Sequence, residues 1–242
     1  MKFSQSKSSH YPRAVLDIGS QNIVCLYGRQ EVGGVKVMGH VRVASRGIES
    51  GSIVNMKLAK ESISQALHEV EEMADTKITE VMGNLAFGRP TSRWEVVHYE
   101  IGGETITDQH IQERIAKIKS IASRETIIMR AIPVEYLLDG NIVRTPVDMK
   151  GERLRVTYHL ISVNRGAYEN MIKAVNECGV DFNAFIPTPS AAAWGVLTDE
   201  EFMNGITVID FGAETTSLGI FDKGVLVHTE QIQIGSSLAT KT

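Results

Sequence analysis

Two segments of the sequence share a residue pattern that can hold phosphate groups. In residues 15–27 (VLDIGSQNIVCLY) and 208–221 (VIDFGAETTSLGIF), an apolar run leads to an Asp, a hydrophobic residue and a Gly. Small polar residues and a second apolar run follow in both. The aspartates, Asp17 and Asp210, are expected at the carboxyl ends of two strands, where open α/β sheets present their ligands. The pair therefore predicts a clamp that closes on nucleotide phosphates from two sides.

The turn residues of each segment are the candidate phosphate ligands, because glycine allows backbone N–H groups to approach phosphate oxygens. The predicted set is Gly19, Ser20, Gln21 and Asn22 on one side and Gly212, Thr215 and Thr216 on the other. Asp17 and Asp210 are the candidate ligands of a hydrated Mg²⁺ ion. Each copy alone also fits an ordinary β-hairpin. The recurrence far along the chain favours duplicated halves facing one cleft.

The composition narrows the class of protein. The 242 residues are 43% hydrophobic and 22% charged, which is ordinary for a soluble globular protein. A net charge of −4 argues against a nucleic-acid binder. Cys25 and Cys178 are expected to be small buried hydrophobes, not a disulfide or a metal site. Residues 1–12 are polar and do not have the pattern of a secretory signal. No run of apolar residues is long enough for a membrane span. The sequence therefore predicts a cytoplasmic location.

The apolar periodicity divides the chain into three parts. Residues 13–82 and 164–200 form a first α/β subdomain, which opens with an antiparallel meander over 13–44 and a helix over 57–74. Residues 83–163 form an inserted α+β subdomain. Residues 205–242 begin a second subdomain that is incomplete. The other expected helices cover 108–122, 168–178 and 187–197, and the other expected strands cover 80–87, 93–100, 125–133, 154–163, 180–186 and 225–234.

Several longer stretches resemble the bacterial FtsA family of the actin-like ATPase superfamily. They are Ser45–Asp75 (SRGIESGSIVNMKLAKESISQALHEVEEMAD), Ile132–Gly140 (IPVEYLLDG), Thr145–Val163 (TPVDMKGERLRVTYHLISV) and Ala174–Glu201. The resemblance runs in order over residues 13–240. It implies an α/β, actin-like (ribonuclease H-like) fold with an inserted subdomain called 1C and a truncated second half.

The resemblance also implies a function. FtsA-like proteins bind ATP with Mg²⁺, polymerise, link the FtsZ ring to the cytoplasmic face of the inner membrane at the division site, and recruit later division proteins. In the full-length family a C-terminal amphipathic helix provides the peripheral membrane attachment, and that helix is expected to be absent here. The alternatives are a PilM-like pilus-assembly protein, a phosphotransferase on the same fold, and a degenerate chain without ATP turnover.

The second loop departs from the family's usual DIGGGTT, because Ala213 and Glu214 replace two glycines. Alanine adopts positive φ only at a cost, and a carboxylate repels a triphosphate. Glu214 either orients a water for attack on the γ-phosphate or lies outside the site. We expect weak ATP binding and at most a weak ATPase. The last strand is expected to have an open edge and an uncovered apolar face, which predicts poor solubility.

Overall fold

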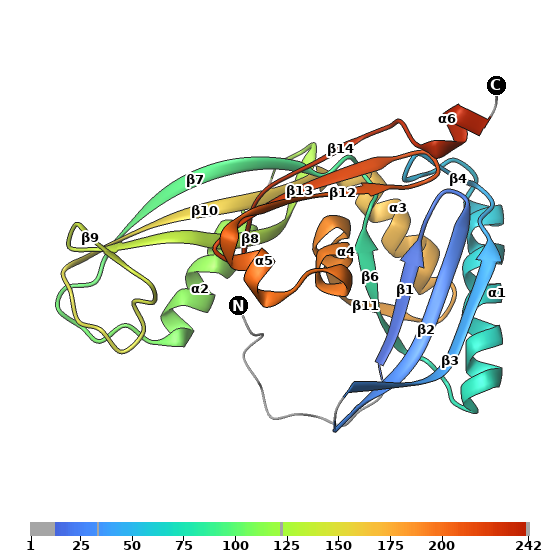
Figure 1. Ribbon diagram of the computed structural model, residues 1–242, viewed down its shortest axis with the longest axis horizontal. Helices are drawn as coiled ribbons and strands as arrows, with labels where there is room; N and C mark the ends of the chain where they lie inside the picture. Colours follow the sequence, from blue (N-terminus) through green and yellow to red (C-terminus); the bar gives the residue numbers. More distant parts are fainter. Residues whose placement is uncertain (1–12, 33, 122, 241–242) are drawn as a thin grey trace.

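The computed structural model describes residues 13–32, 34–121 and 123–240. The predictions placed on residues 1–12, Gly33, Ala122 and 241–242 lie outside the described residues. The centre of the fold is a five-stranded sheet in the order β11-β6-β1-β2-β3 (Figure 1). Its strands are β1 Arg13–Ile18, β2 Asn22–Glu31, β3 Gly34–Ala44, β6 Glu80–Leu85 and β11 Asp181–Pro187. The antiparallel meander β1-β2-β3 is as predicted, and β6 lies parallel to both β1 and β11.

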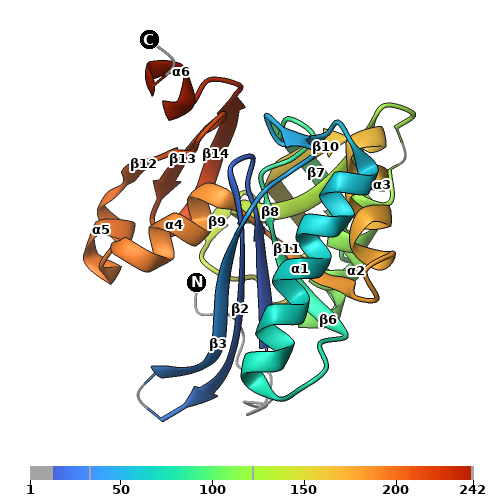
Figure 2. The same cartoon turned by 90° about the vertical axis from the view of Figure 1, so that its right-hand side faces the viewer.

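Two helices cover one face of this sheet, α1 (Met56–Ala74) and α3 (Arg165–Asn176), and α4 (Thr188–Val196) lies on the other (Figure 2). The helices begin where the sequence places a capping side chain. Asn55 accepts a hydrogen bond from the Leu58 N–H, and Asn164 does the same for the Ala167 N–H. Such caps satisfy N–H groups that lack a partner within the helix. Of the apolar residues at helical spacing in α1, Ile63, Ala66, Leu67 and Val70 are buried, Ala74 is half-buried and Met73 is exposed.

The inserted part forms a separate antiparallel sheet in the order β7-β10-β8-β9, with α2 against β8. Tyr158, Leu154 and Leu160 of β10 are fully buried in a hydrophobic cluster of their own. Thr107 caps α2. The elements are β7 Thr91–Glu100, α2 Asp108–Lys119, β8 Thr126–Leu138, β9 Asn141–Val143 and β10 Arg153–Asn164. The boundaries at 83 and 163 remain a prediction.

A third, three-stranded sheet follows α4 and the short α5 (Asp199–Asn204). It contains β12 Ile206–Phe211, β13 Thr216–Asp222 and β14 Val225–Ile232, all antiparallel, and α6 (Ser236–Thr240) comes after it. One face packs on α4: a Cβ on Gly219 would lie 2.6 Å from the Cβ of Pro189. On the other face Ile209, Phe211 and Ile232 are exposed. The expectation of an uncovered apolar face on the last strand is therefore met at Ile232 alone among the apolar residues of β14, because Leu226 is buried and Val225 and Val227 are half-buried.

The expectation of an open edge is wrong for much of β14. Ser92 on β7 accepts a hydrogen bond from the Thr229 N–H (2.8 Å) and donates one to the Thr229 carbonyl (2.6 Å). The Trp94 indole N–H donates to the Val227 carbonyl at 2.9 Å. On β10, Nδ1 of His159 lies 2.8 Å from the Leu226 carbonyl. Side chains of the inserted part therefore satisfy the backbone groups that a neighbouring strand would otherwise pair.

The short elements were not foreseen. They are β4 (Ile48–Glu49), β5 (Ser52–Ile53), β9, α5 and α6. The predicted helix over 168–178 instead begins at Arg165, directly after its cap, and ends at Asn176. Cys25 is buried as expected and Cys178 is half-buried, and both are free thiols. Within the described residues, no helix has the length and hydrophobicity needed to cross a membrane.

Candidate functional site

The two predicted loops adopt the same backbone turn. The Gly19 N–H donates to the Asn22 carbonyl at 3.0 Å, and the Gly212 N–H donates to the Thr215 carbonyl at 2.9 Å. A Cβ would lie 2.9 Å from that carbonyl oxygen in the first loop and 2.8 Å in the second. These separations are shorter than van der Waals contact allows. Glycine is needed at both positions because the chain doubles back so closely, and neither residue has positive φ.

The loops also leave donors free at their tips. In the part of the chain that the structure describes, the N–H groups of Ser20 and Gln21 have no protein acceptor. Such groups at a tight turn are available to an anion. In the second loop, Ala213 does not have positive φ, so the expected backbone cost of replacing glycine there does not arise.

The aspartates lie one residue before the end of β1 and β12. Burial is the main cause that raises the pKa of Asp17, and the negative charge of Asp210 raises it further. Burial also raises the pKa of Asp210. Asp17 keeps one side exposed to solvent, so a ligand can reach its carboxylate. The charge of Asp210 therefore acts on Asp17, and the shared phosphate clamp remains a prediction.

The described residues contain no group of three or more His, Cys, Asp or Glu side chains arranged to hold a metal ion. Two carboxylates remain at the candidate site, Asp17 and Asp210. Mg²⁺ in nucleotide sites takes one or two carboxylates, with phosphate oxygens and waters filling the other positions. The donor set is thus compatible with Mg²⁺ held together with a phosphate ligand.

Some predicted hydroxyl ligands are already engaged. Thr216 is buried at the start of β13, and its hydroxyl donates to the Ile234 carbonyl at 2.7 Å. The Ser20 hydroxyl accepts from the Gly51 N–H at 3.4 Å. Asn22 belongs to β2, and its carbonyl closes the first turn. The backbone of the loops is therefore better placed than Thr216 to meet a phosphate.

Asn84 holds the end of β1, a role that the sequence pattern did not reveal. Its side chain accepts from the Ile18 N–H at 3.0 Å and donates to the Ile18 carbonyl at 3.4 Å. This pair of bonds crosses from β6 to the residue that follows Asp17. A polar Asn inside the apolar run EVMGNLAF was the available signal.

The segment after β14 supports the second loop. The Ser236 N–H donates to the Gly212 carbonyl at 2.9 Å, and the Ser237 N–H donates to the Ala213 carbonyl at 2.8 Å. A Cβ on Gly235 would collide with the Ala213 carbonyl oxygen. These contacts place residues 235–237 against the turn of the second loop.

Glu214 makes a hydrogen bond to the backbone of a segment far from it in the sequence. Its Oε2 accepts a hydrogen bond from the Ser50 N–H at 2.7 Å. Ser50 lies in the turn between β4 and β5, and the Gln233 side chain donates to its carbonyl at 3.4 Å. One carboxylate oxygen of Glu214 is thus engaged with the backbone of the Ser50 turn. The Ser50 turn was missed because only the fold brings it to the loops.

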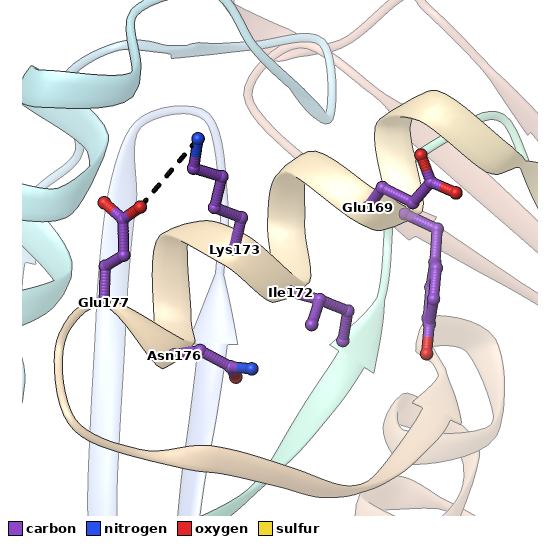
Figure 3. A pocket seen from close by; sticks show the side chains of 6 residues that line it. Glu169, Ile172, Lys173, Asn176 and Glu177 are labelled. Atoms are coloured by element: carbon purple, nitrogen blue, oxygen red, sulfur yellow. Dashed lines mark ion pairs between the residues drawn. The ribbon is translucent and has the colours of Figure 1, made fainter.

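A hollow of about 460 Å³ lies elsewhere, along α3. Figure 3 shows its lining and the ion pair between Lys173 and Glu177, whose atoms are 3.9 Å apart. None of the predicted site residues lines it. The lining residues are Tyr168, Glu169, Ile172, Lys173, Asn176 and Glu177. Because one helix provides all of them, the hollow has no opposing wall of functional side chains.

Known proteins resemble this chain in sequence. The family described as the SHS2 domain inserted in FtsA matches residues 88–162. The cell division protein FtsA of Neisseria meningitidis serogroup B is 32% identical over 231 residues, which are 94% of this chain and 56% of that protein. FtsA of Agrobacterium fabrum is 30% identical, over 99% of this chain and 57% of that protein. The chain therefore spans about half the length of these relatives.

Solved structures resemble it in fold. A chain of the PilM-PilN type IV pilus biogenesis complex superimposes with a TM-score of 0.65 at 14% identity, covering 96% of this chain and 65% of that one. Ethanolamine utilization protein EutJ from Carboxydothermus hydrogenoformans gives 0.53 at 14% identity, covering 98% and 56%. Both have the actin-like ATPase fold. The chain thus has an actin-like fold, is similar in sequence to FtsA over about half of that protein's length, and carries at residues 88–162 a match to the SHS2 domain inserted in FtsA.

Proposed function

We propose that the chain is part of a cell-division scaffold of the FtsA type that holds the phosphates of ATP, with Mg²⁺, between its two hairpin loops. One observation carries the proposal: two loops far apart in sequence have the same turn, and the aspartate beside one feels the charge of the aspartate beside the other. Similarity to FtsA supports the cell-division role.

The residues divide the work of binding. Backbone N–H groups at the tips of both loops would meet phosphate oxygens, and Asp17 and Asp210 would hold the hydrated cation. Two carboxylates with raised pKa repel each other when both are ionised. A divalent cation removes that repulsion, so we expect the cation and the phosphate to bind together.

The wider function is proposed at the level of the family. The full protein would link the FtsZ ring to the cytoplasmic face of the membrane, recruit later division proteins and associate with itself. We place the contacts for partners and for a second copy on the inserted part, residues 83–163. Its sheet offers the long edge strand β7, with exposed charged side chains such as Arg93 and Glu95.

Calorimetric titration with ATP, with and without Mg²⁺, tests the phosphate site. We expect weak binding that needs Mg²⁺, and we expect Asp17→Asn and Asp210→Asn to remove the dependence on Mg²⁺. Asp222→Asn is the matched control, since Asp222 is an exposed carboxylate at the far end of β13. Equal binding by the wild type and both site variants would refute the clamp.

A pilus-assembly role is the second candidate, favoured by the likeness in fold to a chain of the PilM-PilN complex. Photo-crosslinking from Glu95 in living cells separates the two candidates. Crosslinks to division proteins or to a second copy support the FtsA-type role. Crosslinks to pilus proteins favour the alternative, and an absence of both would count against a partner surface on β7.

A further inference from the structure

The turn between β4 and β5 touches both hairpin loops. The Gly51 N–H donates to the Ser20 hydroxyl at 3.4 Å, which connects the turn to the first loop. The Ser50 N–H donates to the Glu214 carboxylate at 2.7 Å, which connects it to the second. Figures 1 and 2 show the tips of the two hairpins at the same end of the molecule. Two successive backbone donors thus stand between the loops.

The conformation of this turn is suited to an anion. Ser50 has a φ of +46° and Gly51 has a φ of +72°, so both are left-handed. Successive N–H groups in turn conformations of this kind form concavities that bind anions. A Cβ on Gly51 would collide with the Ala86 carbonyl oxygen, which requires glycine there. Positive φ at a serine is strained and is retained where the surroundings impose it.

Neighbouring side chains hold the turn in place. Gln233 donates to the Ser50 carbonyl at 3.4 Å. Arg89 in turn donates to the Gln233 side-chain oxygen at 2.6 Å. The backbone of Ser50 is thus held at its N–H by Glu214 and at its carbonyl by Gln233. This arrangement keeps the donor pointed at the second loop when no ligand is present.

The Glu214 carboxylate is itself an anion at this donor. Its hydrogen bond is short and charge-assisted, which makes it stronger than a neutral one. A phosphate group near both loops would need the same N–H and would meet the repulsion of the carboxylate. We propose that the Ser50–Gly51 turn is a third anion-binding element of the clamp and that Glu214 occupies it until a polyphosphate displaces it.

This inference rests on the proposed phosphate site, and it fixes the class of ligand. Displacement needs an anion able to reach the first loop and the Ser50 donor at once, as a diphosphate or triphosphate chain does. The base and sugar take no part in the competition. Inorganic pyrophosphate with Mg²⁺ is therefore a sufficient probe, and ATP with Mg²⁺ tests whether the nucleoside adds affinity.

The experiment compares Glu214→Ala and Glu214→Gln with the wild type by calorimetry, with Mg²⁺-pyrophosphate and then with Mg²⁺-ATP. Removing a competing charge-assisted hydrogen bond is expected to tighten binding about tenfold to hundredfold in Glu214→Ala. Glu214→Gln keeps an acceptor without the charge and is expected to fall between. Glu230→Gln is the control, because it removes one negative charge from an exposed site on β14.

Hydrogen exchange at the Ser50 amide gives a second measurement. In the free protein, Glu214→Ala should exchange this amide faster than the wild type, and pyrophosphate should restore the protection. Binding that is unchanged or weaker in Glu214→Ala would overturn the inference and leave the phosphate site standing. No binding by any variant would overturn both. Binding by Glu214→Ala but not by the wild type would support both the inference and the phosphate site, because Glu214 would then prevent the wild type from binding.

Discussion

Ser92→Ala is expected to weaken the contact between the inserted part and the third sheet. The Ser92 hydroxyl serves both backbone groups of Thr229, which is 3% exposed. Its removal leaves one buried N–H and one buried carbonyl without that partner, and it also removes the 2.7 Å hydrogen bond between the Ser92 hydroxyl and Nε2 of His159. A stranded buried polar group costs about 1–3 kcal/mol, and a water that enters the small gap recovers part of this. We expect the free energy of unfolding to fall by about 2–4 kcal/mol.

Urea unfolding followed by circular dichroism measures this loss. Thr91→Ala is the matched control, since Thr91 precedes Ser92 on β7, is exposed and makes only a 3.4 Å bond to the Ser162 carbonyl. The control should change stability by less than about 0.5 kcal/mol. A Ser92→Ala loss as small as the control's would refute the idea that side chains of β7 replace a neighbouring strand for β14.

Three further outcomes follow from the site and the buried groups. Burial is the largest cause that lowers the pKa of His159 below the usual value of 6.5. The neutral ring therefore contributes its full stability above pH 6.5, and this stability is lost as pH falls through the pKa of the folded protein. The difference between the urea unfolding midpoints at about pH 7.5 and pH 5 should therefore be smaller in His159→Gln than in the wild type. The raised pKa of Asp17 means that its ionisation opposes folding as pH rises, so Asp17→Asn should raise the melting temperature at pH 7, and a lower one would contradict this. Gly212→Ala should cost about 1–3 kcal/mol in urea unfolding, whereas Gly195→Ala, in open space on α4, should be neutral or stabilising.

The sequence was most informative where a structure depends on neighbouring residues. Asn55, Thr107 and Asn164 each begin a helix because a side-chain oxygen accepts a nearby backbone N–H. The meander β1-β2-β3 follows from alternating apolar residues and short turns. Met73 fits the helical spacing of α1 yet is exposed, although its Cβ lies beside Gly39 of β3, because a glycine has no side chain to cover it.

The supporting contacts of the site could not be read in this way. Asn84 reaches Ile18 across a parallel strand pair, and Ser50 reaches Glu214 from a different sheet. Their spacing in the sequence has no period, because several strands and a helix lie between Ile18 and Asn84, and the whole inserted part lies between Ser50 and Glu214. The edge of β14 gave the same difficulty: an unpaired strand was expected, and Ser92 on a distant strand satisfies it.

The two loops reach the same turn by different means, and this explains how the second tolerates its unusual residues. The first loop follows a strand end that Asn84 holds from β6. In the second, the Ser236 and Ser237 N–H groups hold the carbonyls of Gly212 and Ala213. These contacts fix the backbone from outside the loop. A glycine at position 213, which the FtsA pattern usually has, is therefore not needed for the conformation of the turn. Replacement by Ala213 is therefore compatible with the turn, and the residue that alters the site's chemistry is Glu214.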